Sequence, residues 1–263
     1  AEDVDMFTVT DAPSDCFATD VGKWCFALAE ELWPINRSLT GPGLRATLDI
    51  LQRELADLKV HSARTGEVAF DWTIPDEWVF RRAFIECENG ERIVDTIHNN
   101  LHIVGYSEPV DAWMSREKLL EHVYTQPDQP EAIPYVTSYY KRRWGFCMSE
   151  HQKNQMRPGQ YRAMIDADLF PGQMNYGELY IRGEVSEEIF LSTYICHPSM
   201  ANNEISGPVV TTALAKYIMG LPDRRYSYRI VFIPETIGSI LYLSRNLDDM
   251  KKSVIAGFNV TCI

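Results

Sequence analysis

The stretch STYICHPSMANNEISGP, residues 192–208, decides how the fold and the function of this sequence are predicted. It begins at the end of an apolar run, EEIFLSTYIC (187–196), that carries hydrophobic side chains on both faces of an extended chain. A strand of this kind is typical of the centre of a sheet that is covered on both sides. His197 follows the run directly, and Ser206 and Pro208 are suited to begin a helix. The stretch therefore predicts a core strand that leads through a polar loop into a helix.

The residues on either side continue an alternation of strands and helices. After the helix that begins near Ser206, we predict a core strand at 226–234, a helix at about 237–250 and a last strand at 253–263. This order predicts an α/β sheet with right-handed crossovers and helices on both faces. Upstream, the hydrophobic spacing predicts helices at 20–33 and 44–58, and three strands between residues 160 and 196.

The pattern of apolar and polar residues changes between about residues 66 and 125. Short alternating stretches predominate there, and Asn89-Gly90 between apolar runs is typical of a tight hairpin. We predict a small, mostly β inserted domain at 66–125, within a main α/β domain made of residues 1–65 and 126–263. Because the sequence stops on an apolar core strand, we expect the main domain to be truncated at its C-terminal end.

Composition disfavours several classes of partner. The net charge is −12, from 25 basic and 37 acidic residues, which disfavours binding to nucleic acid or to an anionic membrane. No apolar run is long enough to span a bilayer, and the acidic N-terminus does not resemble a signal peptide. The 6 cysteines form no CxxC pair, and several lie in apolar runs, as buried free thiols do. We therefore expect a cytoplasmic protein.

Polar side chains gather where the predicted core strands end. His197 follows one strand and Glu235 follows the next in the same way, with Asn203 and Glu204 in the loop between them. In open α/β sheets, ligands bind at the carboxyl ends of the strands. An imidazole with carboxylates suits zinc or another divalent ion, and one carboxylate could act as general base on a metal-bound water. A second interpretation stays open, in which His197 is a hydrogen-bonded loop residue and the others serve turns and helix caps.

Other candidates carry weaker signals. His98 and His102 have the spacing of paired ligands on a helix, but their surroundings predict a strand and a turn, so a structural role is favoured. Tyr139 and Tyr140 are candidates for lining a substrate pocket, with core packing as the alternative. Arg37 is a candidate for binding a substrate carboxylate or phosphate, with a solvated or ion-paired arginine as the alternative.

Longer motifs carry a resemblance to a known family. CHPSMANNEISGPVV and FIPETIGS are similar to the strand ends of the di-zinc aminopeptidases. PINRSLTGPGLR, WTIPDEW, LHIVGYSEPVD, IPYVTSYYKRRWGFC and NYGELYIRG resemble a bacterial aminopeptidase-like branch that is often labelled as associated with polysaccharide biosynthesis. The resemblance covers nearly the whole chain. It implies a phosphorylase/hydrolase-like fold, a small inserted domain and one or two zinc ions.

The resemblance also implies roles for individual residues. His197 matches the metal-binding histidine, and Glu235 matches one of two paired glutamates and implies the catalytic base. Asn203 stands where a metal-bridging aspartate is expected, and Glu204 beside it is a candidate to supply the missing carboxylate. Ser199 and Thr236 replace two further acidic residues of the motifs. An amide bridges two cations far less well than a carboxylate, so the pattern favours a single metal over a pair.

Two functional hypotheses follow. The first is a metal-dependent aminopeptidase-like hydrolase that cleaves a peptide or other amide bond, on a polysaccharide-related substrate according to the label of the branch. The second is a non-catalytic protein that binds a small molecule or carbohydrate on the same scaffold, because acidic residues are absent at Ser199 and Asn203. In either case the inserted domain is a candidate surface for homo-oligomerisation.

Overall fold

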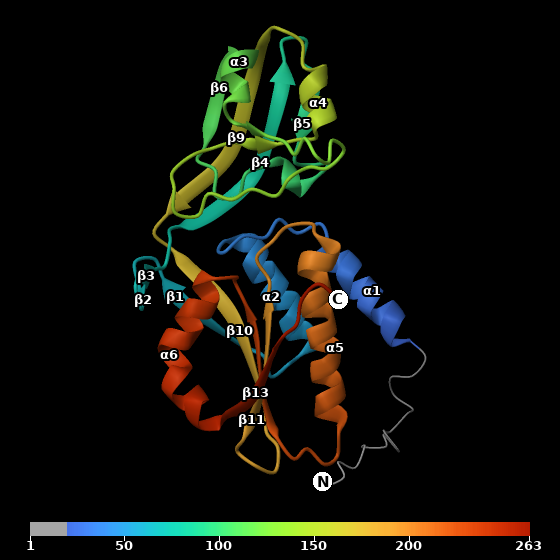
Figure 1. Cartoon of the computed structure of the whole chain (residues 1–263), viewed down its shortest axis with the longest axis vertical. Coiled ribbons are helices and arrows are strands. Elements are labelled where there is room, and N and C mark those ends of the chain that lie inside the picture. The colour runs from blue at the N-terminus through green and yellow to red at the C-terminus, as the bar shows by residue number, and fades with distance from the viewer. Residues whose placement is uncertain (1–19) are drawn as a thin grey trace, which may run out of the picture.

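The structure of the chain is a computed structural model that describes residues 20–263. These residues form two lobes, each built around a sheet of its own (Figure 1). Cys16 and the acidic N-terminal stretch lie outside the described residues. No helix between residues 20 and 263 is both long enough and apolar enough to cross a bilayer.

The larger lobe contains a mixed five-stranded sheet in the order β1-β10-β12-β11-β13. β11 is parallel to both of its neighbours, β12 and β13, whereas β10 is antiparallel to β1 and β12. The predicted central position of the apolar strand before His197 is therefore confirmed. The strands are β1 (Lys59–Arg64), β10 (Gln173–Ile181), β11 (Glu188–Tyr194), β12 (Ser227–Ile233) and β13 (Val254–Asn259).

Helices cover both faces of this sheet, as the two-faced apolar strands predict (Figure 1). The helices are α1 (Val21–Leu32), α2 (Pro42–Glu54), α5 (Ser206–Gly220) and α6 (Ile237–Ser253). Leucines of α2 and the apolar stripe of α5 pack on one face, around Phe232 and Ile230. α6 packs on the other face through Leu241 and Tyr242. α1 lies outside α5, and the two helices share a small apolar cluster.

The smaller lobe contains a four-stranded sheet in the order β5-β4-β9-β6, with every pair antiparallel. Its elements are β4 (Glu77–Cys87), β5 (Arg92–Asp95), the 3₁₀ turn η1 (Asn100–His102), β6 (Val110–Ser115), α3 (Arg116–Leu120), α4 (Glu150–Gln155) and β9 (Gln160–Phe170). Two short ribbons complete the fold: β2 (Val68–Ala69) with β3 (Trp72–Thr73), and β7 (Val123–Tyr124) with β8 (Phe146–Cys147). The smaller lobe is thus mostly β.

The sheet of the smaller lobe extends further along the chain than the range predicted for the insert. β9 pairs with β4 along most of its length, although the prediction placed residues 126–263 in the main domain. The chain enters this lobe along β4 and returns along β9 to β10 (Figure 1). The reason is physical: the alternation of β9 identifies a strand, but only non-local pairing decides which sheet it joins.

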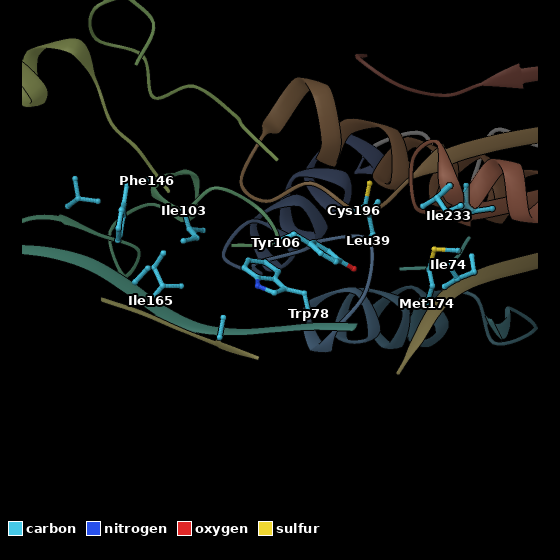
Figure 2. Packing of buried hydrophobic residues seen from close by; sticks show 14 of the residues in the cluster. Leu39, Ile74, Trp78, Ile103, Tyr106, Phe146, Ile165, Met174, Cys196 and Ile233 are labelled. Carbon is cyan, nitrogen blue, oxygen red and sulfur yellow. The ribbon is translucent and has the colours of Figure 1, made fainter. Parts of the chain in front are cut away.

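One apolar cluster runs through the junction between the lobes (Figure 2). Leu39, Trp78 and Tyr106 lie in the middle of the cluster, with side chains of the smaller and larger lobes on either side. The backbone N–H of Trp78 donates to Thr40 Oγ1 at 3.0 Å, and the hydroxyls of Tyr106 and Thr40 are 2.6 Å apart. Shared packing and these bonds hold the smaller lobe against the carboxyl-end edge of the sheet.

Candidate active site

His197 and Glu235 emerge side by side from two neighbouring parallel strands. Tyr194 at the end of β11 pairs with Ile233 at the end of β12, so the residues that follow each strand leave the sheet at the same edge. His197 Nε2 lies 3.0 Å from a carboxylate oxygen of Glu235. The predicted juxtaposition is confirmed, and the Glu235 carboxylate contacts His197 directly.

The backbone around these two residues is unusual. Ser199 and Thr236 have positive φ angles of 44° and 58°, a conformation that residues other than glycine seldom adopt. Between them, η2 (Ala201–Ile205) is a turn of π-helix that leads into α5. Strained residues and π-helical turns both concentrate at functional sites. In a π-helical turn, the additional residue changes the direction of the side chains around it. Here the turn directs Asn203 and Glu204 toward His197.

Glu204 faces the opposite edge of the imidazole from Glu235. One Glu204 oxygen, Oε2, lies 3.2 Å from His197 Nδ1, and the side-chain oxygen of Asn203 is 3.1 Å from the same nitrogen. Glu204 is only 1% exposed, whereas the side chain of Glu235 is 50% exposed. The imidazole therefore lies between a buried carboxylate and an accessible one.

Arg37 belongs to the same buried network. It lies in the loop after α1, is 3% exposed, and its Nε is 3.6 Å from Glu204 Oε1. The guanidinium also donates to the carbonyls of His197 at 3.0 Å and Leu32 at 2.7 Å. These partners are all protein groups. Arg37 thus contacts the site from its buried side, through Glu204 and the carbonyl of His197. Binding of a substrate anion by Arg37 stays a prediction.

Burial and charge set the ionisation of this network. Burial disfavours the charged imidazole, but the contacts with Cys196 and Glu204 outweigh it and raise the pKa of His197 to about 11. Burial also raises the pKa of Glu204, against the opposing effects of His197 and Arg37. A metal ion that binds Nε2 has to replace a proton there, so metal binding is expected to release protons.

The donor set suits one divalent ion better than two. Cys196, His197 and Glu204 are close enough to form a group of candidate ligands, with donor atoms within 4.8 Å of one another. That group is wholly buried, and the Arg37 cation beside Glu204 disfavours a second cation there. His197 Nε2 and Glu235 are the better pair, because Glu235 borders a cavity of about 330 Å³. Catalytic zinc usually has three protein ligands, and residues 20–263 bring two to this position.

Tyrosines surround the imidazole, and sequence reasoning missed two of them. The rings of Tyr135 and Tyr194 lie 4.9 Å and 5.2 Å from the ring of His197. The hydroxyl of Tyr139 is 2.9 Å from that of Tyr135, so Tyr139 is one residue removed from the site. Tyr140 is 55% exposed and packs edge-on against Trp72. The position of Tyr135 in IPYVTSYY, four residues before Tyr139, is the only signal that pointed to it.

The remaining candidates lie elsewhere. Ser199 donates to the carbonyl of Trp33 at 3.1 Å and accepts from Asn100 at 2.9 Å, so it faces the end of α1 and not His197. His102 is buried and bonds through Nδ1 to the carbonyl of Cys147 at 2.8 Å. Among residues 20–263, neither His98 nor His102 joins a group of metal-ligating side chains. Their structural interpretation agrees with this placement.

The fold is similar to that of the zinc aminopeptidases. The zinc aminopeptidase of Bacillus subtilis has a TM-score of 0.60 at 10% identity, over 92% of this chain and 69% of that chain. A peptidase M28 precursor from Shewanella amazonensis has a TM-score of 0.56 at 12% identity, over 90% of this chain and 73% of that chain. At such identities the likeness establishes the fold alone.

The chain belongs to the family described as a domain of unknown function (DUF4910), whose family model matches residues 26–263. A candidate polysaccharide biosynthesis protein with an aminopeptidase-like domain, from Clostridium acetobutylicum, is 43% identical over 246 residues. A solved candidate peptidase from the same organism has a TM-score of 0.90 at 42% identity, over 94% of this chain. The chain spans 56% of the length of the first relative and 58% of the second.

Proposed function

We propose that this chain carries the centre of a metal-dependent hydrolase of the aminopeptidase type, which cleaves a peptide or other amide bond. The supporting observation is the 3.0 Å approach of His197 Nε2 to the half-exposed carboxylate of Glu235, at the ends of adjacent parallel strands. The aminopeptidase-like fold adds support, although the fold by itself does not decide the chemistry.

Each residue has a role in this proposal. Zinc, when bound, would polarise the scissile carbonyl and lower the pKa of water. His197 supplies a metal ligand through Nε2. Glu235 borders the cavity, where it would share the metal with His197 through one carboxylate oxygen and accept a proton from water through the other. Tyr135 and Tyr194 pack around the imidazole, which keeps bulk water away from one side of the site.

The substrate class is the finer part of the proposal. The named relative from Clostridium acetobutylicum is a candidate polysaccharide biosynthesis protein, which supports an amide bond on a sugar-derived substrate. Tyr139 and Tyr140 border a separate groove of about 310 Å³, which we propose as the place for the part of the substrate away from the scissile bond, with that bond in the cavity beside Glu235. Lys141 also lines this groove.

Kinetics with a panel of aminoacyl anilides, in the presence of zinc, test the proposal. Glu235→Gln keeps the size of the side chain and removes its basicity, so kcat/KM should fall by about 10²–10⁴-fold. Glu117→Gln is the matched control, because Glu117 is exposed at the start of α3 in the smaller lobe. Equal rates for both variants, or no turnover by the wild-type protein with zinc, would count against hydrolysis.

A binding protein on the same scaffold is the alternative function. It is favoured by the amide of Asn203 and by the Ser199 hydroxyl, which bonds away from His197. A crystal soaked with an aminoacyl sugar amide distinguishes the two. An intact molecule in the cavity beside Glu235, together with absent turnover, would support binding without cleavage.

A further inference from the structure

The carboxylates of Glu235 and Glu204 contact opposite nitrogens of the His197 imidazole, and the two carboxylates differ in exposure. Glu235 contacts Nε2 and is half exposed, whereas Glu204 contacts Nδ1 and is 1% exposed. A ligand that enters from the cavity therefore meets Glu235 and not Glu204. A carboxylate that holds the far nitrogen of a metal-ligating histidine fixes its ring orientation and makes the other nitrogen a better donor.

The buried charge of Glu204 has one fixed counter-charge besides His197. Arg37 Nε lies 3.6 Å from Glu204 Oε1, and the side chains of both residues are almost fully enclosed. Arg37 also donates to the carbonyl of His197. The same guanidinium therefore contacts both the backbone of His197 and the Glu204 carboxylate beside its ring. Arg37 Nη2 and both Glu204 oxygens have no hydrogen-bond partner of regular geometry among the described residues, so Glu204 acts on His197 and Arg37 through charge, at 3.2 Å and 3.6 Å.

Among residues 20–263 no other carboxylate contacts Nδ1, although the side-chain oxygen of Asn203 is slightly nearer, at 3.1 Å against 3.2 Å. Ser199, two residues after His197, is held by Trp33 and Asn100. Asn203 offers only a neutral amide oxygen to Nδ1. Glu204 reaches the ring because it lies on the π-helical turn η2.

We propose that Arg37 and Glu204 form a buried positioning pair that holds His197 by Nδ1 and presents Nε2 to Glu235 and the metal. Glu204 is then a positioning residue and not a metal ligand. The part that concerns the metal rests on the proposed function, whereas the part that concerns the orientation of the ring does not.

The test compares Glu204→Gln, the double variant Arg37→Met/Glu204→Gln, and the surface control Glu117→Gln. Zinc affinity is measured by calorimetry at fixed pH, and the His197 ring is located in metal-free crystal structures. Both site variants should bind zinc about 10–100-fold more weakly than the wild-type protein, with the control unchanged. Their His197 ring should also turn or shift away from its 3.0 Å contact with Glu235.

The double variant separates positioning from simple charge balance. If Glu204 only neutralised Arg37, then removing both charges would restore wild-type zinc affinity and ring position, and the proposal would be overturned. Zinc bound directly to Glu204 in a crystal structure would also overturn it. If the wild-type protein binds no zinc, the hydrolase proposal fails, while an unmoved ring in both variants is what refutes the positioning role.

Discussion

Replacing Glu204 by glutamine should destabilise the protein severely, because it leaves the Arg37 cation without a counter-charge in the interior. The two side chains approach to 3.6 Å with exposures of 2% and 1%. At an effective dielectric constant of about 20, Coulomb's law gives an attraction of about 4–5 kcal/mol at that distance. Breaking one partner of a buried ion pair typically costs about 3–5 kcal/mol. We therefore expect the free energy of unfolding to fall by about 3–5 kcal/mol in Glu204→Gln.

A double-mutant cycle isolates this interaction. Urea unfolding is followed by tryptophan fluorescence, with chelator present, for the wild-type protein, Arg37→Met, Glu204→Gln and the double variant. The double variant removes both charges and should be more stable than the sum of the single losses implies, by at least about 2 kcal/mol. If the two losses add to within about 0.5 kcal/mol, the pair is not coupled and the reasoning from its geometry is wrong.

Two further predictions concern the supports of the site and of the smaller lobe. In Gly207→Ala at the start of α5, the new methyl would lie 2.5 Å from both Thr193 Oγ1 and the carbonyl of Val260, so unfolding experiments should show a loss of about 1–3 kcal/mol. Gly220→Ala is the control, because its methyl would meet nothing within 4 Å, and equal losses in both variants would contradict the prediction. Burial opposes the ionisation of Asp95, but bonds from Arg82 and from the amide of Ile97 outweigh it and hold its pKa below the usual value. The resulting stabilisation is present above about pH 4 and is lost as the pH falls through the lowered pKa, so Asp95→Asn should flatten the acid limb of a pH–stability curve. An unchanged acid limb would contradict it.

The main features of the sheet and the meeting of His197 with Glu235 could be predicted from sequence. Strands that are apolar on both faces mark the centre of a covered sheet, and strands joined by helices place their carboxyl ends at one edge. Both inferences need only the local pattern of side chains. The contact between His197 and Glu235 follows from this topology.

Features that depend on non-local contacts could not be predicted in the same way. The sequence placed Asn203 and Glu204 near the site, but whether Glu204 faces Nδ1 or Nε2 depends on one extra residue in the turn η2. Arg37 is far from His197 in sequence, so its bond to the His197 carbonyl left no local pattern. The pairing of β9 with β4 could not be predicted for the same reason, because it joins strands far apart in the sequence.

A calorimetric titration of the metal-free protein with zinc tests the shared site of His197 and Glu235 most directly. The titration compares the wild-type protein with His197→Ala, Glu235→Gln and the exposed control Glu117→Gln. We predict one zinc ion per chain, affinity lowered at least about tenfold in both site variants, and wild-type affinity in the control. Equal affinity in all four proteins would show that the two side chains, although 3.0 Å apart, do not share a cation, and would contradict the central claim.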